Sequence, residues 1–201
     1  MKLIGMLDSP YVRRVAISLQ LLDLPFEHQS LSVFRTFDEF SRTNPVVKAP
    51  TLVCDDGTVL MDSTLILQYA EALAGRSLLP AEPQVLARSL CTVGLALAAC
   101  EKAVQIVYEH GLRPADKLHQ PWLDRVTGQL LSACDGLEQA MPTGMDQAGV
   151  STAVAWEFIQ KMVPDVVPAA RYPRLVAFSL AAEGLPAFRA APHGDSTYRA
   201  G

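Results

Sequence analysis

The chain has 201 residues, of which 50% are hydrophobic and 19% are charged, and its net charge is −4. This composition is typical of a globular protein with a substantial buried core, and it excludes a largely disordered chain. An acidic balance also argues against a nucleic-acid-binding protein, which usually carries a basic face. The four cysteines include no C-x-x-C pair, so we expect neither a zinc site nor a dithiol redox motif.

Targeting signals are not evident in the sequence. We expect no apolar run to reach the roughly 18 residues that a membrane-spanning helix needs. The apolar start MKLIGML is interrupted by Asp8 and is too short for a signal peptide. We therefore expect a cytoplasmic protein with reduced thiols and no membrane partner.

The first part of the chain alternates strand and helix patterns. Residues 1–6 and 26–31 read as strands on either side of a helix over 10–23, and Pro25 prevents that helix from continuing. A βαβ unit of this kind predicts a parallel pair of strands joined by a right-handed crossover.

A hairpin and a second helix complete the predicted first domain. Two β-like runs at 50–56 and 58–62 are joined by an Asp-Gly step, which is a strong hairpin signal. A helix over 63–75 follows, with Ser63 placed to cap it and Gly75 placed to end it.

The pattern becomes helical beyond a proline-bearing linker. We predict a first domain over 1–77, a linker over 78–85 and an all-helical domain over 86–201. The predicted helices lie near 90–107, 122–137, 150–163 and 174–190, the last interrupted at Gly184–Pro186. The third is apolar nearly all round, which predicts a central position, and Asp146 is a candidate cap for it.

The first of these helices carries an apolar stripe whose members step by three or four residues, which predicts its buried face. The stripe comprises Leu90, Val93, Leu97, Cys100, Val104 and Val107.

Three polar groups stand beside strands of the first domain. Ser9 precedes Pro10 at a helix start, where it either caps the helix or donates a hydrogen bond to an anion held at the helix N-terminus. Lys48 lies before Pro50 and is either a solvated charge or a ligand-binding residue, and a cis bond before Pro50 is an open alternative.

The third group opens the helix predicted at 63–75. Ser63 either caps this helix or, with Asp62, forms a second anion-binding start in the same small domain.

Together these groups resemble the glutathione-binding signature of the cytosolic glutathione transferases, most closely the bacterial type with a serine at the active-site turn. The residues that carry the resemblance are Ser9-Pro10-Tyr11 with Arg13, Asn44-Pro45, Lys48-Ala49-Pro50-x-Leu52 and Asp62-Ser63. The resemblance implies an α/β plus all-α fold, with a thioredoxin-like N-terminal domain (βαβ-ββα) followed by an α-helical bundle.

The resemblance also implies roles at the sulfur end of glutathione. Ser9 would donate a hydrogen bond to the sulfur and lower the pKa of the thiol. Ala49, before a cis Pro50, would pair its backbone with the cysteinyl part of the tripeptide.

The two carboxylate ends of the tripeptide have their own candidates. Ser63 would hold the γ-glutamyl carboxylate and Asp62 would face its ammonium. Lys48 would reach the glycine carboxylate, with Arg35 and Arg42 as alternatives.

The function that the resemblance implies is conjugation of glutathione to a small apolar electrophile by a homodimeric, detoxifying enzyme without a metal. The electrophile pocket is expected between the domains, with Tyr11, Tyr108 and His110 as candidate lining residues. Two alternatives remain: a glutathione-dependent isomerase of the maleylacetoacetate type, in which Arg13 would take part, and a binding protein that has kept the fold and lost the chemistry. The chain departs from the family in lacking an S/T-x-x-D capping box before its central helix.

Overall fold

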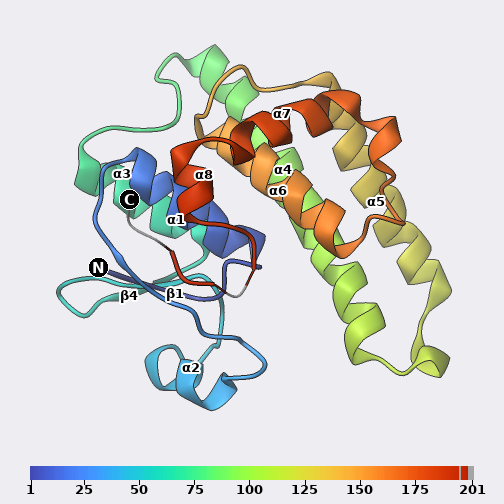
Figure 1. The fold of residues 1–201 in the computed structure, drawn as a ribbon, viewed down its shortest axis with the longest axis horizontal. Helices are drawn as coiled ribbons and strands as arrows, with labels where there is room; N and C mark the ends of the chain where they lie inside the picture. The colour runs from blue at the N-terminus through green and yellow to red at the C-terminus, as the bar shows by residue number, and fades with distance from the viewer. Residues whose placement is uncertain (195, 199–201) are drawn as a thin grey trace. The chain divides into compact units, whose positions relative to one another are not determined.

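In the computed structural model, which describes residues 1–194 and 196–198, the chain forms two compact units (Figure 1). The first unit contains Met1–Leu78 together with the described residues from Glu183 onward, and the second contains Leu79–Ala182. The segment after Glu183 thus associates with the first unit, although it falls within the helical domain predicted over 86–201.

A mixed four-stranded sheet organises the first unit. The strand order is β2-β1-β3-β4, with β1 parallel to β2 and antiparallel to β3, and β3 antiparallel to β4. The strands are β1 (Lys2–Ile4), β2 (Glu27–Gln29), β3 (Thr51–Val53) and β4 (Val59–Met61). This arrangement confirms the predicted thioredoxin-like domain, with the expected βαβ unit and hairpin.

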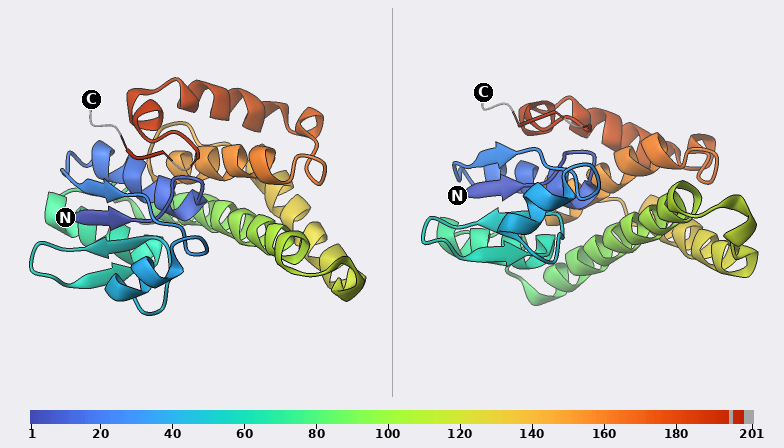
Figure 2. Two further views of the ribbon diagram at one scale, coloured as in Figure 1. Left: turned by 60° about the horizontal axis from the view of Figure 1, so that its bottom comes forward. Right: turned by 90° about the horizontal axis from the view of Figure 1, so that it is seen from below.

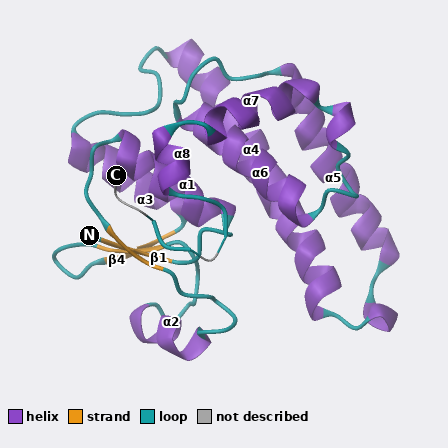
Figure 3. Ribbon diagram, in the orientation of Figure 1, coloured by secondary structure: helices purple, strands orange, loops and turns teal. Residues whose placement is uncertain are grey.

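Helices cover both faces of this sheet. Figures 1 and 3 show α1 (Pro10–Leu21) and α3 (Ser63–Ala74) on one face and the short α2 (Phe37–Thr43) on the other. Ser9 caps α1 as predicted. The prediction that Ser63 caps α3 is wrong: Asp62 is the cap and Ser63 is the first helical residue.

The C-terminal segment packs against α1 through Arg13, whose side chain is 1% exposed. The Arg13 guanidinium donates to both carboxylate oxygens of Glu183, at 2.7 and 2.6 Å, and to the Ala191 carbonyl at 2.7 Å. It also lies over the ring of Phe188, which belongs to α8 (Pro186–Ala190). These contacts join α1 to a segment about 170 residues further along the chain.

The second unit is helical, as predicted. It contains α4 (Pro83–Leu112), η1 (Ala115–Lys117), α5 (Gln120–Gln139), α6 (Gln147–Met162), η2 (Ala169–Arg171) and all but the last residue of α7 (Pro173–Glu183). Figure 2 shows α4 and α5 running side by side as a long hairpin.

Helix α6 has the central position that its sequence predicted, since most of its residues are buried. The Asp146 carboxylate accepts a hydrogen bond from the Gly149 amide at 2.9 Å, so Asp146 replaces the missing capping box.

The buried face of α4 matches the predicted stripe only in part, since Val93 and Cys100 are buried as predicted. Leu90 is 47% exposed, whereas the small residues Ala96, Ala99 and Ala103 are buried. Small side chains let neighbouring helices approach closely, and this packing overrides the larger apolar stripe. The helix is also long and apolar enough, by length and composition alone, to cross a membrane. Its most apolar stretch contains Glu101 and Lys102, so α4 holds no uninterrupted apolar run of that length, and the helix packs here against α5 and α6.

Candidate functional site

Strand register brings the three predicted polar groups to one edge of the sheet. Ile4 at the end of β1 pairs with Thr51 at the start of β3, and Thr51 pairs with Met61 at the end of β4. The turn after β1, the loop before β3 and the start of α3 after β4 therefore meet at this edge. A single ligand lying along it would meet residues from all three.

Ser9 lies at the first of these positions, half-buried at the N-terminus of α1. Its Oγ accepts a hydrogen bond from the Val12 amide at 3.4 Å. This contact uses the hydroxyl oxygen as an acceptor, so the hydroxyl proton is still available to donate. The free amides and the dipole of α1 favour negative charge in front of Ser9.

The loop before β3 is shaped by a buried polar chain. Asn44 is 3% exposed and its Nδ2 donates to the Thr51 hydroxyl at 2.8 Å, which in turn donates to the Lys48 carbonyl at 2.7 Å. The Ala49–Pro50 peptide bond that follows is cis, the open alternative of the sequence analysis. Asn44 was part of the recognised motif, but its partners lie across the loop and could not be identified from the sequence.

Two of the three described non-glycine residues with positive φ lie at or next to the predicted ligand contacts, and the third, Asp23, follows α1. Val47 has φ 50° and Asp62 has φ 65°, both in the region that favours glycine. Such conformations cost about 1–3 kcal/mol each and cluster at ligand-binding sites. Their positions, immediately before Lys48 and Ser63, are consistent with a site built at this edge of the sheet.

A buried arginine of α1, which was not among the predicted site residues, contacts the start of α3. Arg14 is 4% exposed, and its Nη1 donates to the hydroxyls of Ser63 at 3.2 Å and Thr64 at 3.3 Å. A guanidinium can only donate, so the Ser63 oxygen accepts and the Ser63 proton can be directed to another acceptor. The Asp62 carboxylate accepts from the Thr64 amide at 2.8 Å. The only hint in the sequence was a second arginine on a helix with a buried face.

The candidate basic residues lie at different distances from the turn that carries Ser9. The side chain of Arg35 approaches this turn, with Nη2 3.4 Å from the Met6 sulfur. Lys48 is exposed and directly precedes Ala49, and Arg42 is exposed on α2.

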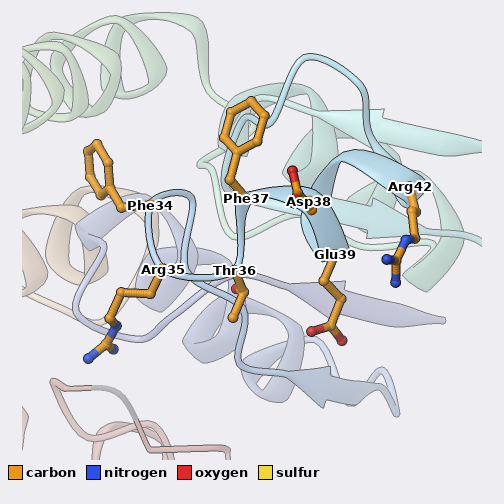
Figure 4. Close-up of a pocket in the computed structure, with 7 residues that line it drawn as sticks. All are labelled: Phe34, Arg35, Thr36, Phe37, Asp38, Glu39 and Arg42. Carbon is orange, nitrogen blue, oxygen red and sulfur yellow. The ribbon is translucent and has the colours of Figure 1, made fainter.

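An open hollow of about 400 Å³ runs along the α2 segment (Figure 4). In this view Phe34 and Phe37 point to one side, and Arg35, Glu39 and Arg42 point to the other. Its lining includes none of Ser9, Ala49 and Ser63, so the hollow is not the predicted sulfur site. It is lined by Phe34, Arg35, Thr36, Phe37, Asp38, Glu39 and Arg42.

The residues predicted for the electrophile pocket belong to both units. Tyr11 is half-buried on α1, whereas Tyr108 and His110 are exposed near the end of α4. Their assembly into one pocket remains a prediction. Among the described residues, no three His, Cys, Asp or Glu side chains come together in a group that could hold a metal ion.

Comparison with known proteins identifies the family. Residues 3–78 match the family described as the glutathione S-transferase N-terminal domain. A glutathione transferase family member from Pseudomonas fluorescens Pf-5, solved with bound glutathione, is 29% identical, with a TM-score of 0.82 over 94% of this chain and 97% of that chain. Residues 3–78 therefore form a glutathione S-transferase N-terminal domain. The predicted resemblance to the glutathione S-transferases is thereby confirmed, whereas the role of Ser9 stays a prediction.

Further relatives match most of the chain. The uncharacterized GST-like protein YibF of Escherichia coli is 26% identical over 176 residues, which cover 82% of this chain and 85% of YibF. A glutathione S-transferase from Methylobacterium radiotolerans, solved with glutathione sulfonate, has a TM-score of 0.86 at 24% identity, covering 94% of this chain and 92% of that chain. At that identity the second match supports the fold alone.

Proposed function

We propose that this protein is a glutathione transferase that activates glutathione as a thiolate and conjugates it to a small apolar electrophile. The observation that carries the proposal is the register of Ile4, Thr51 and Met61, which gathers the three polar groups and two helix N-termini at one sheet edge. The glutathione found in the P. fluorescens relative supports the same ligand class.

The tripeptide would lie along this edge with its sulfur in front of Ser9. The Ala49 backbone would pair with the cysteinyl part, in the manner of an added strand. The γ-glutamyl end would lie at α3, where the Ser63 hydroxyl and the buried Arg14 favour its carboxylate and Asp62 favours its ammonium.

The basic side chain at the glycine end is proposed to be Lys48, which adjoins Ala49. Arg35 is the alternative, because it contacts the turn that carries Ser9.

Catalysis would come from a lowered thiol pKa and from proximity. A free thiol has a pKa of about 8.5 and is only a few per cent ionised at pH 7. The Ser9 hydroxyl and the N-terminus of α1 would both stabilise the thiolate. No general base is needed, because the hydroxyl acts as a donor.

The test is Ser9→Ala, with Ser132→Ala on α5 as a matched control. A hydrogen bond to a charged group contributes about 1.5–3 kcal/mol. The pKa of bound glutathione should therefore rise by about one to two units, and kcat should fall at least ten-fold at pH 7 with little change in KM. An unchanged rate in the Ser9 variant would remove this residue from the mechanism.

The two rival functions are separated by direct assays. Arg13, which an isomerase of the maleylacetoacetate type would use, is buried against Glu183, and this weakens the isomerase alternative. Conversion of maleylacetoacetate without net consumption of glutathione would support it. Retention on immobilised glutathione without turnover of chlorodinitrobenzene would support a binding protein.

We also propose a homodimer, together with the cytoplasmic location and detoxifying role that the family resemblance implies. Leu65, Tyr69 and Leu73 form an exposed apolar row at a spacing of four residues on α3, and such a row is a candidate contact with a second copy. Light scattering of the purified chain and of Leu65→Asp tests this: the substitution should halve the measured mass.

A further inference from the structure

His28 on β2 is hydrogen-bonded at both of its ring nitrogens. Its Nε2 lies 2.7 Å from the Gly5 carbonyl oxygen, and its Nδ1 accepts from the Tyr198 amide at 2.9 Å. Because a carbonyl only accepts and an amide N–H only donates, the ring must be neutral with its proton on Nε2. Burial lowers the pKa of His28, which favours the same neutral form.

The Gly5 bond acts on the turn that carries Ser9. Gly5 has φ 134°, and a methyl group added to it would lie 2.6 Å from the Val12 Cγ2 atom and 3.1 Å from the Ala49 Cβ atom. The next residues form a turn closed by the Ser9 amide, which donates to the Met6 carbonyl at 3.2 Å. Gly5 is therefore packed between α1 and the loop before β3, and its carbonyl direction sets where this turn begins.

The Tyr198 bond acts on the C-terminal segment. The Tyr198 ring stacks on Phe26 with ring centres 4.5 Å apart, so this residue is seated beside β2. The same segment is held earlier along its length by Arg13, which bonds to the Ala191 carbonyl, and by Gln20, which bonds to the Ala187 carbonyl.

We propose that His28 is a positioning residue that couples the docked C-terminal segment to the turn carrying Ser9. The Tyr198 amide fixes the ring orientation and the tautomer, and the resulting Nε2–H holds the Gly5 carbonyl. The consequence for glutathione binding rests on the proposed function, whereas the mechanical coupling does not.

Two substitutions separate the two bonds of His28. The amide of His28→Gln reaches the Nε2 position and can keep the bond to Gly5. The amide of His28→Asn reaches only the Nδ1 position and can keep the bond to Tyr198. One hydrogen bond corresponds to about a five-fold effect. His28→Asn should therefore speed hydrogen exchange in the Met6–Ser9 turn about five-fold and raise the Kd for glutathione by a similar factor, while His28→Gln should change both less.

The coupling itself is tested at Tyr198. Tyr198→Pro removes the amide donor, and Tyr198→Ala keeps it while removing the stacked ring. In the chain with His28, the proline variant should speed exchange of the Met6–Ser9 turn about five-fold beyond the alanine variant. In the His28→Gln background the two Tyr198 variants should give the same exchange rate, because the substituted glutamine side chain no longer uses that amide.

The coupling and the role at the ligand site are tested by different outcomes. Equal effects of Tyr198→Pro in both backgrounds, or no effect in either, would overturn the coupling. Coupled exchange with an unchanged Kd for glutathione in His28→Asn would overturn the positioning role at the ligand site. Hydrogen exchange needs no catalysis, so a failure of the proposed transferase function would be seen separately in the Ser9→Ala assay.

Discussion

The ion pair between Arg13 and Glu183 should dominate the attachment of the C-terminal segment to the first unit. The Arg13 side chain is 1% exposed and that of Glu183 is 27% exposed. Removing one partner of a buried pair costs about 3–5 kcal/mol, chiefly because the other charge is left without compensation. Water can reach a stranded Glu183 but not a stranded Arg13. Glu183→Met should therefore lower the free energy of unfolding by about 4 kcal/mol and Arg13→Met by about 3 kcal/mol.

The double variant distinguishes this reasoning from a simple loss of packing. With both charges gone, no buried guanidinium remains unpaired, so Arg13→Met with Glu183→Met should be more stable than Glu183→Met alone. Arg13→Lys should fall between the wild type and Arg13→Met, because one ammonium cannot reproduce the two-pronged contact with Glu183.

The measurement must report on the first unit. Both tryptophans, Trp122 and Trp156, lie in the helical unit, so their fluorescence would follow the other half of the chain. Native-state hydrogen exchange of α1 amides under increasing urea gives the required free energies. The reasoning is refuted if the two single substitutions sum in the double variant, or if Glu183→Met costs less than about 1 kcal/mol.

Two further predictions follow from polar groups of the first unit. Asn44→Leu should lower the free energy of unfolding by about 1–3 kcal/mol in a urea titration and raise the KM for glutathione. The reason is that the Thr51 hydroxyl loses its buried donor and the Val46 amide loses its acceptor. Burial lowers the pKa of His28, so this side chain takes up a proton more readily in the unfolded chain than in the folded one. The contribution of neutral His28 to the free energy of unfolding should therefore be fully present above about pH 6.5 and should decrease as the pH falls below that value. Urea midpoints measured from pH 7.5 to 5 should show this decrease, and it should be smaller in His28→Gln.

Local sequence signals predicted most of the fold. The Asp56-Gly57 step predicted the hairpin, Gly75 ends α3 in a left-handed conformation, and Asp146 caps α6. Each of these depends on residues within a few positions of one another, where turn and cap preferences act directly. The three predicted polar groups meet at one edge because β1 pairs with β3 and β3 pairs with β4. The hairpin signal predicted the second pairing, whereas the first joins strands that are distant in sequence.

The roles of the two arginines on α1 could not be predicted in this way. Arg13 and Arg14 are adjacent, yet one bonds to Glu183 and the other to Ser63. Successive helical positions point about 100° apart, so neighbouring side chains meet different partners. Their partners are distant in sequence and no local pattern identifies them. The contacts that tie the segment after Glu183 to the first unit are also distant in sequence, so the sequence pattern predicts this segment as part of the helical domain.

The return of the C-terminal segment to α1 bears on how the protein is made. Glu183 and Ala191 leave the ribosome about 170 residues after Arg13. During synthesis, the thioredoxin-like half can form its sheet while one guanidinium of its first helix still awaits a counter-charge. Its final consolidation therefore has to come after translation of the entire helical half, even though the residues of its sheet were made long before.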